Sequence, residues 1–298
     1  MYWCADLKQV QRYCPFRKTL GKATRFGYVK MARDSSCLYE SDEYWRRNPS
    51  FFEEDTDWKV SNIKPLIDRY ANIDQKNRIT LLDVGGGSGR ILRGVADYLR
   101  ARHNVTVTKY MLDLSPEALE IQKRENQDFA KALNEDIRKT SLRAKEIDLA
   151  LMIDVLEHVD DPERALEQLR RISRFVIFKI PVESTLCFAF ANMLTRGRSR
   201  RTLCQEGHVN QYTYWGLTRQ IRSDCGEIRD TMLCNLSQYL MSLPSFKRQK
   251  LVSQAPNIIG DLLGNLHPML RCVFVGDMMV CLVECGDSYR NKNTRKGF

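Results

Sequence analysis

Residues 81–90 read LLDVGGGSGR, an apolar run that ends in a turn rich in glycine. Gly85, Gly87 and Gly89 occupy alternate positions of this turn, and apolar residues at helical spacing follow it. Glycine lets the backbone approach a ligand closely, and the N-terminus of a helix attracts negative charge. The spacing is GxGxG rather than the GxGxxG of dinucleotide-binding enzymes. The stretch therefore predicts a strand, a tight turn and a helix that together form an anion-binding corner.

Further strands and helices alternate along the chain beyond this turn. Short apolar runs predict strands at residues 79–84, 105–112, 129–133, 148–153, 174–180, 227–234 and 278–284. Ser115 before Pro116, and Asp161 before Pro162, each supply an N-cap followed by a proline at the first helical position. This alternation predicts an α/β fold, in which crossover helices flank a doubly wound, mostly parallel sheet of seven strands.

Acidic residues lie at the ends of the first three predicted strands. Asp83 stands just before the glycine turn, Asp113 ends the second strand, and Asp136 closes the third. In an open α/β sheet, ligands bind beyond the carboxyl ends of the strands. Any one of these acids could cap a helix or lie in a solvated turn. Their placement at three successive strand ends favours a binding site.

These features, together with residues 154–162 (DVLEHVDDP), resemble the class I, Rossmann-like S-adenosylmethionine-dependent methyltransferases. The resemblance implies that the last two strands form an antiparallel hairpin at one edge of the sheet. It also implies that Asp83 lies near the methionine end of the cofactor, that Asp113 binds both ribose hydroxyls, and that Asp136 and Ile137 lie at the adenine. The cofactor-binding residues that it implies are Asp83, Gly85, Gly87, Gly89, Asp113, Leu114, Asp136, Ile137 and Asp154.

Two stretches of sequence bear on the acceptor. Residues 155–162 (VLEHVDDP) and 206–217 (EGHVNQYTYWGL) resemble the small-molecule branch of the family, which includes methyltransferases of quinone biosynthesis and of polysaccharide or natural-product precursors. The proline-rich tetrapeptide of amino-directed base methylases and the Pro-Cys pair of cytosine methylases are both missing after residue 153. We therefore expect methyl transfer to oxygen or nitrogen of a small natural-product, quinone-like or sugar-linked acceptor. The alternatives are an RNA-directed methyltransferase, an oxidoreductase that uses a nicotinamide cofactor, and a non-catalytic binding module.

The same stretches contain the candidate catalytic residues. Histidine titrates near neutral pH, so His158 or His208 could remove the proton of the acceptor. His158 could instead cap the strand end, and His208 could anchor a loop. Asp154, Glu157 and His158 are candidate ligands of a divalent ion such as Mg²⁺, Mn²⁺ or Zn²⁺. We favour the general base over the metal, and S-adenosylmethionine as the one required cofactor.

Three stretches lie outside this minimal fold. Residues 1–78 are predicted to cover the substrate, and residues 79–298 to form the methyltransferase domain, with insertions at about 182–212 and 236–270. The first stretch is rich in aromatic residues and in Lys and Arg, and a second basic run lies at residues 196–201. These runs account for much of the net charge of +10 and are compatible with an anionic acceptor.

The composition also predicts the environment of the protein. Its ten cysteines form no CxxC pair and follow no signal peptide, which indicates reduced thiols and a cytoplasmic location. Its longest apolar stretches are far shorter than the roughly 20 residues that span a bilayer. The sequence therefore predicts a soluble or at most peripheral protein, and leaves the oligomeric state open, a dimer included.

Overall fold

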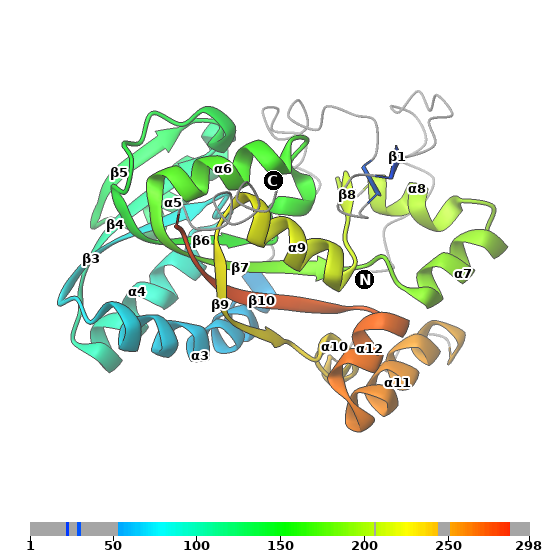
Figure 1. The fold of residues 1–298 in the computed structure, drawn as a ribbon. Coiled ribbons are helices and arrows are strands. Elements are labelled where there is room, and N and C mark those ends of the chain that lie inside the picture. The colour runs from blue at the N-terminus through cyan, green and yellow to red at the C-terminus, as the bar shows by residue number, and fades with distance from the viewer. Residues whose placement is uncertain (1–21, 24–28, 31–52, 206, 244–250, 287–298) are drawn as a thin grey trace, which may run out of the picture.

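The computed structural model describes residues 22–23, 29–30, 53–205, 207–243 and 251–286. Within these residues, one sheet contains seven strands, which are Arg78–Val84 (β3), Thr106–Asp113 (β4), Phe129–Asn134 (β5), Ile147–Ile153 (β6), Ser173–Val182 (β7), Glu227–Leu233 (β9) and Asp277–Glu284 (β10). Their order is β5-β4-β3-β6-β7-β10-β9 (Figure 1). The strands from β3 to β7 are parallel, and β10 is antiparallel to both β7 and β9. The predicted fold class is confirmed.

The antiparallel edge pair differs from a simple hairpin. The last strand, β10, lies between β7 and β9, and residues 234–276 connect β9 to it. β7 also extends beyond its predicted end at residue 180, because Pro181 and Val182 pair with Met278 and Asp277 of β10. The local pattern predicted each strand, whereas pairing with neighbours decides where a strand ends.

Helices cover both faces of the sheet. One face carries α3 (Thr56–Asp74), α4 (Arg90–His103) and α5 (Pro116–Glu125), and the other carries α6 (Pro162–Ile172) and α9 (Tyr214–Asp224) (Figure 1). Adjacent residues of β3 point to opposite faces: Leu81 belongs to the core beneath α3 and α4, and Leu82 to the core beneath α6 and α9. Both side chains are fully buried. Burial on both faces explains why the central strands are nearly continuous apolar runs.

The predicted helix starts are confirmed. The Ser115 side chain accepts a hydrogen bond from the Ala118 backbone N at 3.2 Å, at the start of α5. The Asp161 side chain accepts one from the Arg164 backbone N at 3.2 Å, at the start of α6. Each cap satisfies a backbone donor that the first turn of a helix leaves without a partner.

Part of the stretch predicted as an N-terminal cover lies on the sheet. α3 buries Ile63, Leu66, Ile67 and Tyr70, and its first residues reach the carboxyl ends of the strands. The aromatic residues Tyr39, Tyr44, Trp45, Phe51 and Phe52 lie outside the described residues. The cover role of residues 1–78 stays a prediction.

The remaining elements extend the carboxyl-end side of the sheet. They are the small sheet of β1 (Lys22–Ala23), β2 (Val29–Lys30) and β8 (Asn210–Gln211), the short helices η2 (Glu53–Asp55), η3 (Ile137–Lys139) and η4 (Leu156–His158), and the helices α7 (Leu186–Leu194), α8 (Arg198–Gln205), α10 (Leu236–Ser242), α11 (Leu251–Leu266) and α12 (Pro268–Phe274). Those from α7 to β8 and from α10 to α12 fall within or beside the predicted insertions. None of the described helices combines the length and apolar character needed to cross a membrane.

Candidate active site

A cleft opens at the carboxyl ends of β3, β4, β5 and β6. All of the predicted cofactor-binding residues except Gly89 line it: Asp83, Gly85, Gly87, Asp113, Leu114, Asp136, Ile137 and Asp154. Thr56 and Lys59 of α3 form part of its wall, and so does His158. The empty space amounts to about 1170 Å³, including the open mouth. The structure thus brings residues from four strand ends into one binding site.

The glycine turn requires glycine at specific positions. Gly89, which caps α4, has φ of 78°, and a Cβ there would lie 2.7 Å from Asn126 Nδ2 and 3.0 Å from the backbone Cα of Gln122. A Cβ at Gly86 would lie 2.3 Å from Asp83 Oδ2. Side chains at these positions would therefore clash with the residues that shape the cleft. Although Gly89 does not line the cleft, it sets the path of the turn that does.

Asp83 is the most unusual acid in the cleft. Its side chain is buried, and its Oδ2 atom has no hydrogen-bond partner. Burial, and then the charge of Asp113, raise the pKa of Asp83 to about 7. A buried polar atom without a partner costs free energy, so such atoms in native proteins call for a functional reason. The orphan oxygen fits a site at which a ligand supplies the missing donor.

Asp113 is held in a defined orientation. Its Oδ1 accepts a hydrogen bond from the Ser115 backbone N at 3.0 Å, and its Oδ2 accepts one from Gln122 Nε2 at 2.7 Å. Burial raises the pKa of Asp113 to about 6, although the bonds from Ser115 and Gln122 oppose this shift. The backbone N–H groups of Gly87 and Leu114 also donate to this carboxylate, so its orientation is fixed at the carboxyl end of β4, in the wall of the cleft.

Asp136 has a partner that sequence reasoning missed. Its carboxylate accepts hydrogen bonds from the Arg138 backbone N at 2.9 Å and from Arg138 Nε at 2.9 and 3.0 Å. Burial opposes ionisation of Asp136, but these bonds prevail and lower its pKa. Arg138 also lines the cleft, next to the buried Ile137. Nothing in the local pattern distinguished Arg138 from a solvated residue.

Two lysines form ion pairs with Asp154, and neither sequence motif predicted this contact. Lys179 Nζ of β7 lies 2.6 and 2.8 Å from the two carboxylate oxygens, and Lys59 Nζ of α3 lies 3.1 Å from Oδ2. Burial disfavours the ionised carboxyl, but Lys179 and Lys59 outweigh it and hold the pKa of Asp154 well below its usual value. Asp154 also adopts a left-handed backbone, with φ of 55°. A lysine inside the apolar run 174–180 was the one sequence signal for this contact.

The two candidate catalytic histidines lie together. The ring centroids of His158 and His208 are 4.8 Å apart, with the planes nearly perpendicular. His208 Nδ1 lies 2.9 Å from Glu183 Oε2, and Glu157, buried beside them, has an Oε2 atom without a hydrogen-bond partner. Burial, and then His208, lower the pKa of His158 to about 3, whereas burial, and then Asp154, raise the pKa of Glu157 to about 8.

This cluster changes the candidate metal site. Glu157, His158 and His208 each offer one ligand atom, and these atoms all lie within 4.8 Å of one another. The sequence predicted Asp154, Glu157 and His158 instead. The difference has a physical reason, because Lys59 and Lys179 already neutralise Asp154. His208, at the far end of an insertion in the sequence, takes its place in the cluster.

A comparison of the sequence with models of known protein families agrees with the fold and with the position of the cleft. The sequence model of the methyltransferase domain family matches residues 52–220, which is more than half of the chain. The chain belongs to this family. The predicted fold and the predicted methyl donor of the family, S-adenosylmethionine, are thereby confirmed. A search of the curated proteins finds no significant match to this methyltransferase.

Solved structures share the fold at low sequence identity. The plantazolicin methyltransferase BpumL in complex with SAH is 17% identical, with a TM-score of 0.52, over 85% of this chain and 94% of that chain. Geranyl diphosphate methyltransferase in complex with SAM is 10% identical, with a TM-score of 0.51, over 76% of this chain and 85% of that chain. At these identities the likeness concerns the fold alone.

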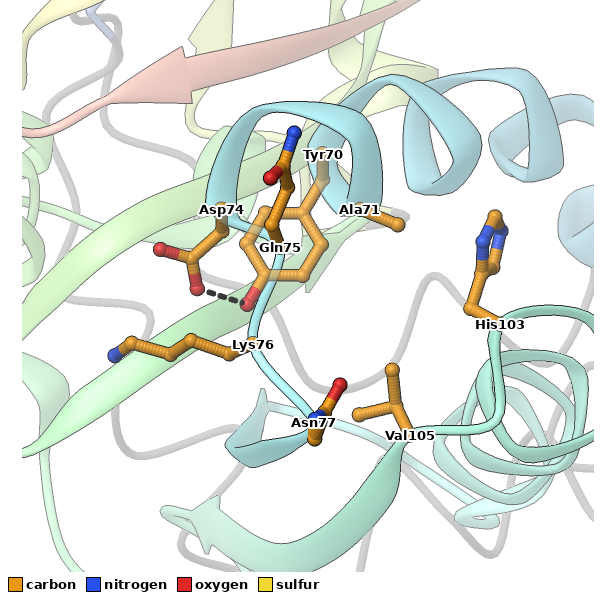
Figure 2. A pocket seen from close by; sticks show the side chains of 8 residues that line it. All are labelled: Tyr70, Ala71, Asp74, Gln75, Lys76, Asn77, His103 and Val105. Carbon is orange, nitrogen blue, oxygen red and sulfur yellow. Dashed lines mark hydrogen bonds between the residues drawn. The ribbon is translucent and has the colours of Figure 1, made fainter.

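A second, smaller cavity of this methyltransferase lies at the opposite end of the sheet. Figure 2 shows it between the end of α3 and the segments that lead into β3 and β4, with Asp74, Lys76 and His103 around it. Tyr70 Oη donates a hydrogen bond to Asp74 Oδ2 at 2.9 Å. The cavity lies away from the carboxyl ends of the parallel strands, where ligands of this fold class bind. The first cleft is therefore the candidate active site.

Proposed function

We propose that this methyltransferase transfers a methyl group to an oxygen or nitrogen atom of a small-molecule acceptor. The observation that carries the proposal is the position of His158, which lines the cofactor cleft and contacts His208. The proposal includes the natural-product, quinone-like or sugar-linked acceptors that the sequence resemblance favours. It also includes a cytoplasmic location.

The cleft has the features that the adenosyl cofactor requires. The glycine turn leaves room that a Cβ would fill, and the orphan Oδ2 of Asp83 lacks a donor. Asp113, fixed by Ser115 and Gln122, would bind the ribose hydroxyls, and Ile137 would lie against the adenine. When bound, S-adenosylmethionine supplies a methyl group on a positively charged sulfur. Asp113→Ala should lower the affinity for S-adenosylhomocysteine in calorimetry by about tenfold or more.

His158 and its neighbours are positioned to remove the proton of the acceptor. A hydroxyl or ammonium acceptor must lose its proton before it can attack a methyl carbon, and a positioned side chain typically accelerates such a transfer. His158 lies in the cleft wall and can accept this proton; burial lowers its pKa, so the ring stays unprotonated but is a weaker base than a free histidine. The carboxylate of Glu183 lies 2.9 Å from His208 Nδ1 and orients the His208 ring beside His158.

Single-histidine variants test this role. With an acceptor identified from a broad panel, His158→Ala and His208→Ala should lose about 10²–10⁴-fold in turnover at saturating cofactor. His103→Ala, which alters a histidine beside the opposite cavity, is the matched control and should retain its turnover. A loss below about threefold in both variants would leave catalysis to proximity and orientation alone.

Metal-assisted deprotonation is a second candidate, and one specific observation favours it. The ligand atoms of Glu157, His158 and His208 lie within reach of a single divalent ion. A bound ion would acidify an acceptor oxygen without a general base. Chelator should then abolish turnover in the wild type, and added Mg²⁺, Mn²⁺ or Zn²⁺ should restore it. Turnover that is unchanged by chelator would rule out this candidate.

A further inference from the structure

The helix α7 exposes apolar side chains that a globular protein would normally bury. Residues 186–194 contain no charged residue, yet Leu186, Phe190, Met193 and Leu194 are 55–67% exposed. Among the large apolar side chains of α7, only Phe188 is buried. A helix that is apolar on all sides is usually enclosed by protein or lipid. The exposed side of α7 therefore has no packing partner within the described part of the chain.

A second apolar stripe lies close to α7. Ile258, Leu262 and Leu266 follow one another at intervals of four residues along α11, and their exposed fractions are 38%, 62% and 77%. Leu270 and Phe274 continue the stripe on α12, which contacts α7. Figure 1 shows α7, α11 and α12 on the same side of the molecule. We call the exposed apolar residues of these three helices the apolar surface. Exposed apolar side chains gathered on neighbouring helices mark an interaction site.

The charge beside α7 indicates the chemistry of the partner. Arg196 and Arg198 lie two and four residues after the exposed Leu194, and both arginines are exposed. Residues 184–205 contain four arginines and no acid. An apolar helix face bordered by arginine fits the interface of a bilayer, with the apolar side chains among acyl chains and the arginines at anionic headgroups.

We propose that the apolar surface docks this methyltransferase onto an anionic lipid bilayer. The helices lie in the interface and do not cross the bilayer. α7 follows Val182 at the end of β7, and α12 precedes Asp277, the partner of Val182 at the start of β10. The apolar surface therefore occupies the same edge of the sheet as the cofactor cleft. Docking turns this edge of the sheet toward the lipid, so an acceptor with an acyl or isoprenoid chain can reach the cleft. The access of such an acceptor rests on the proposed function, whereas the docking does not.

Vesicle flotation of the full chain tests the docking without any need for methyl transfer. The protein should float with vesicles of phosphatidylcholine and phosphatidylglycerol, and much less with phosphatidylcholine alone. The triple variant Phe190→Ser, Met193→Ser, Leu194→Ser should reduce the bound fraction about tenfold or more. Ile73→Ser is the matched control. It replaces an apolar residue that is 40% exposed at the C-terminal end of α3, away from the apolar surface, and this variant should bind vesicles as the wild type does.

Each outcome supports or overturns the proposal. Circular dichroism checks the fold of the variants, and Met193→Ser, which alters the most exposed large apolar side chain of α7, serves if the triple variant does not fold. A partial loss in Arg196→Glu, Arg198→Glu would support the headgroup contact. Wild-type protein that stays unbound at low salt, or a folded α7 variant that binds as the wild type does, would overturn the proposal. A dimer that the α7 substitutions convert to a monomer, without vesicle binding, would assign the surface to a second copy of the chain instead. A methyltransferase that floats but shows no turnover would leave the docking intact and contradict only the proposed function.

Discussion

Asp83→Asn should change how the stability of the protein depends on pH. Burial and Asp113 raise the pKa of Asp83 from 3.8 to about 7. Between pH 5 and pH 7 the folded protein therefore keeps a proton on Asp83 that the unfolded chain has lost, and its stability falls as the pH rises. One unit of pH corresponds to 1.36 kcal/mol for one proton. The loss from this residue amounts to about 2.7 kcal/mol over the two pH units and ends above pH 7.

The asparagine variant has no such proton, so it should escape this loss. Urea unfolding of both proteins at pH 5 and pH 8 gives four free energies of unfolding. We expect the variant to gain about 3 kcal/mol over the wild type between the two pH values. Comparing each protein with itself cancels the cost of an unpaired amide at position 83. Asp113 and Asp83 repel each other, so the titration of Asp113 also changes when the charge at position 83 is removed, and this change forms part of the expected difference. An equal change in wild type and variant, within about 0.5 kcal/mol, would show that Asp83 titrates normally and that its burial has no electrostatic consequence.

Three further predictions concern the cleft. Gly89→Ala places a methyl group 2.7 Å from Asn126 Nδ2 on a backbone with φ of 78°, which strains the turn. Calorimetry should therefore show at least about tenfold weaker binding of S-adenosylhomocysteine. Wild-type affinity would mean that the turn adapts without cost. Lys179→Met leaves the half-buried Asp154 with Lys59 as its one lysine partner and should lower the free energy of unfolding by about 2 kcal/mol. Adding Asp154→Asn should recover much of the loss, and failure to recover would refute the ion-pair explanation. Ribose binding needs an ionised Asp113, and burial raises the pKa of Asp113 to about 6. The affinity for S-adenosylhomocysteine should therefore fall about tenfold for each pH unit below pH 6. A constant affinity from pH 5 to pH 7 would contradict the role of Asp113.

The sequence predicted those features that are encoded within a few residues. The strand, glycine turn and helix at residues 79–99, and the caps at Ser115 and Asp161, depend on local apolar periodicity and on backbone donors nearby. The acids at the strand ends lie in one cleft because parallel strands place their carboxyl ends at one edge.

Long-range contacts escaped this reasoning. Lys59 and Lys179 both meet Asp154, although they lie on a helix and a strand far apart in the sequence. His208 comes to His158 through the path of an insertion, which no local pattern determines. The position of β10 between β7 and β9 likewise depends on pairing across residues 234–276. The sequence contains these residues, but only the packed sheet shows which of them meet.

The connection between β9 and β10 leaves and re-enters the sheet at nearly one point. The Cys234 backbone N donates a hydrogen bond to the Met278 backbone O at 3.0 Å, so the two ends of residues 234–276 are fastened together. The entropic cost of closing such an excursion grows only slowly with its length. α10, α11 and α12 can therefore be shortened, lengthened or exchanged as a unit while the sheet keeps its register. An engineer could graft another connection between Cys234 and Met278 and so replace the exposed apolar residues of α11 and α12, while the residues that line the cleft stay as they are.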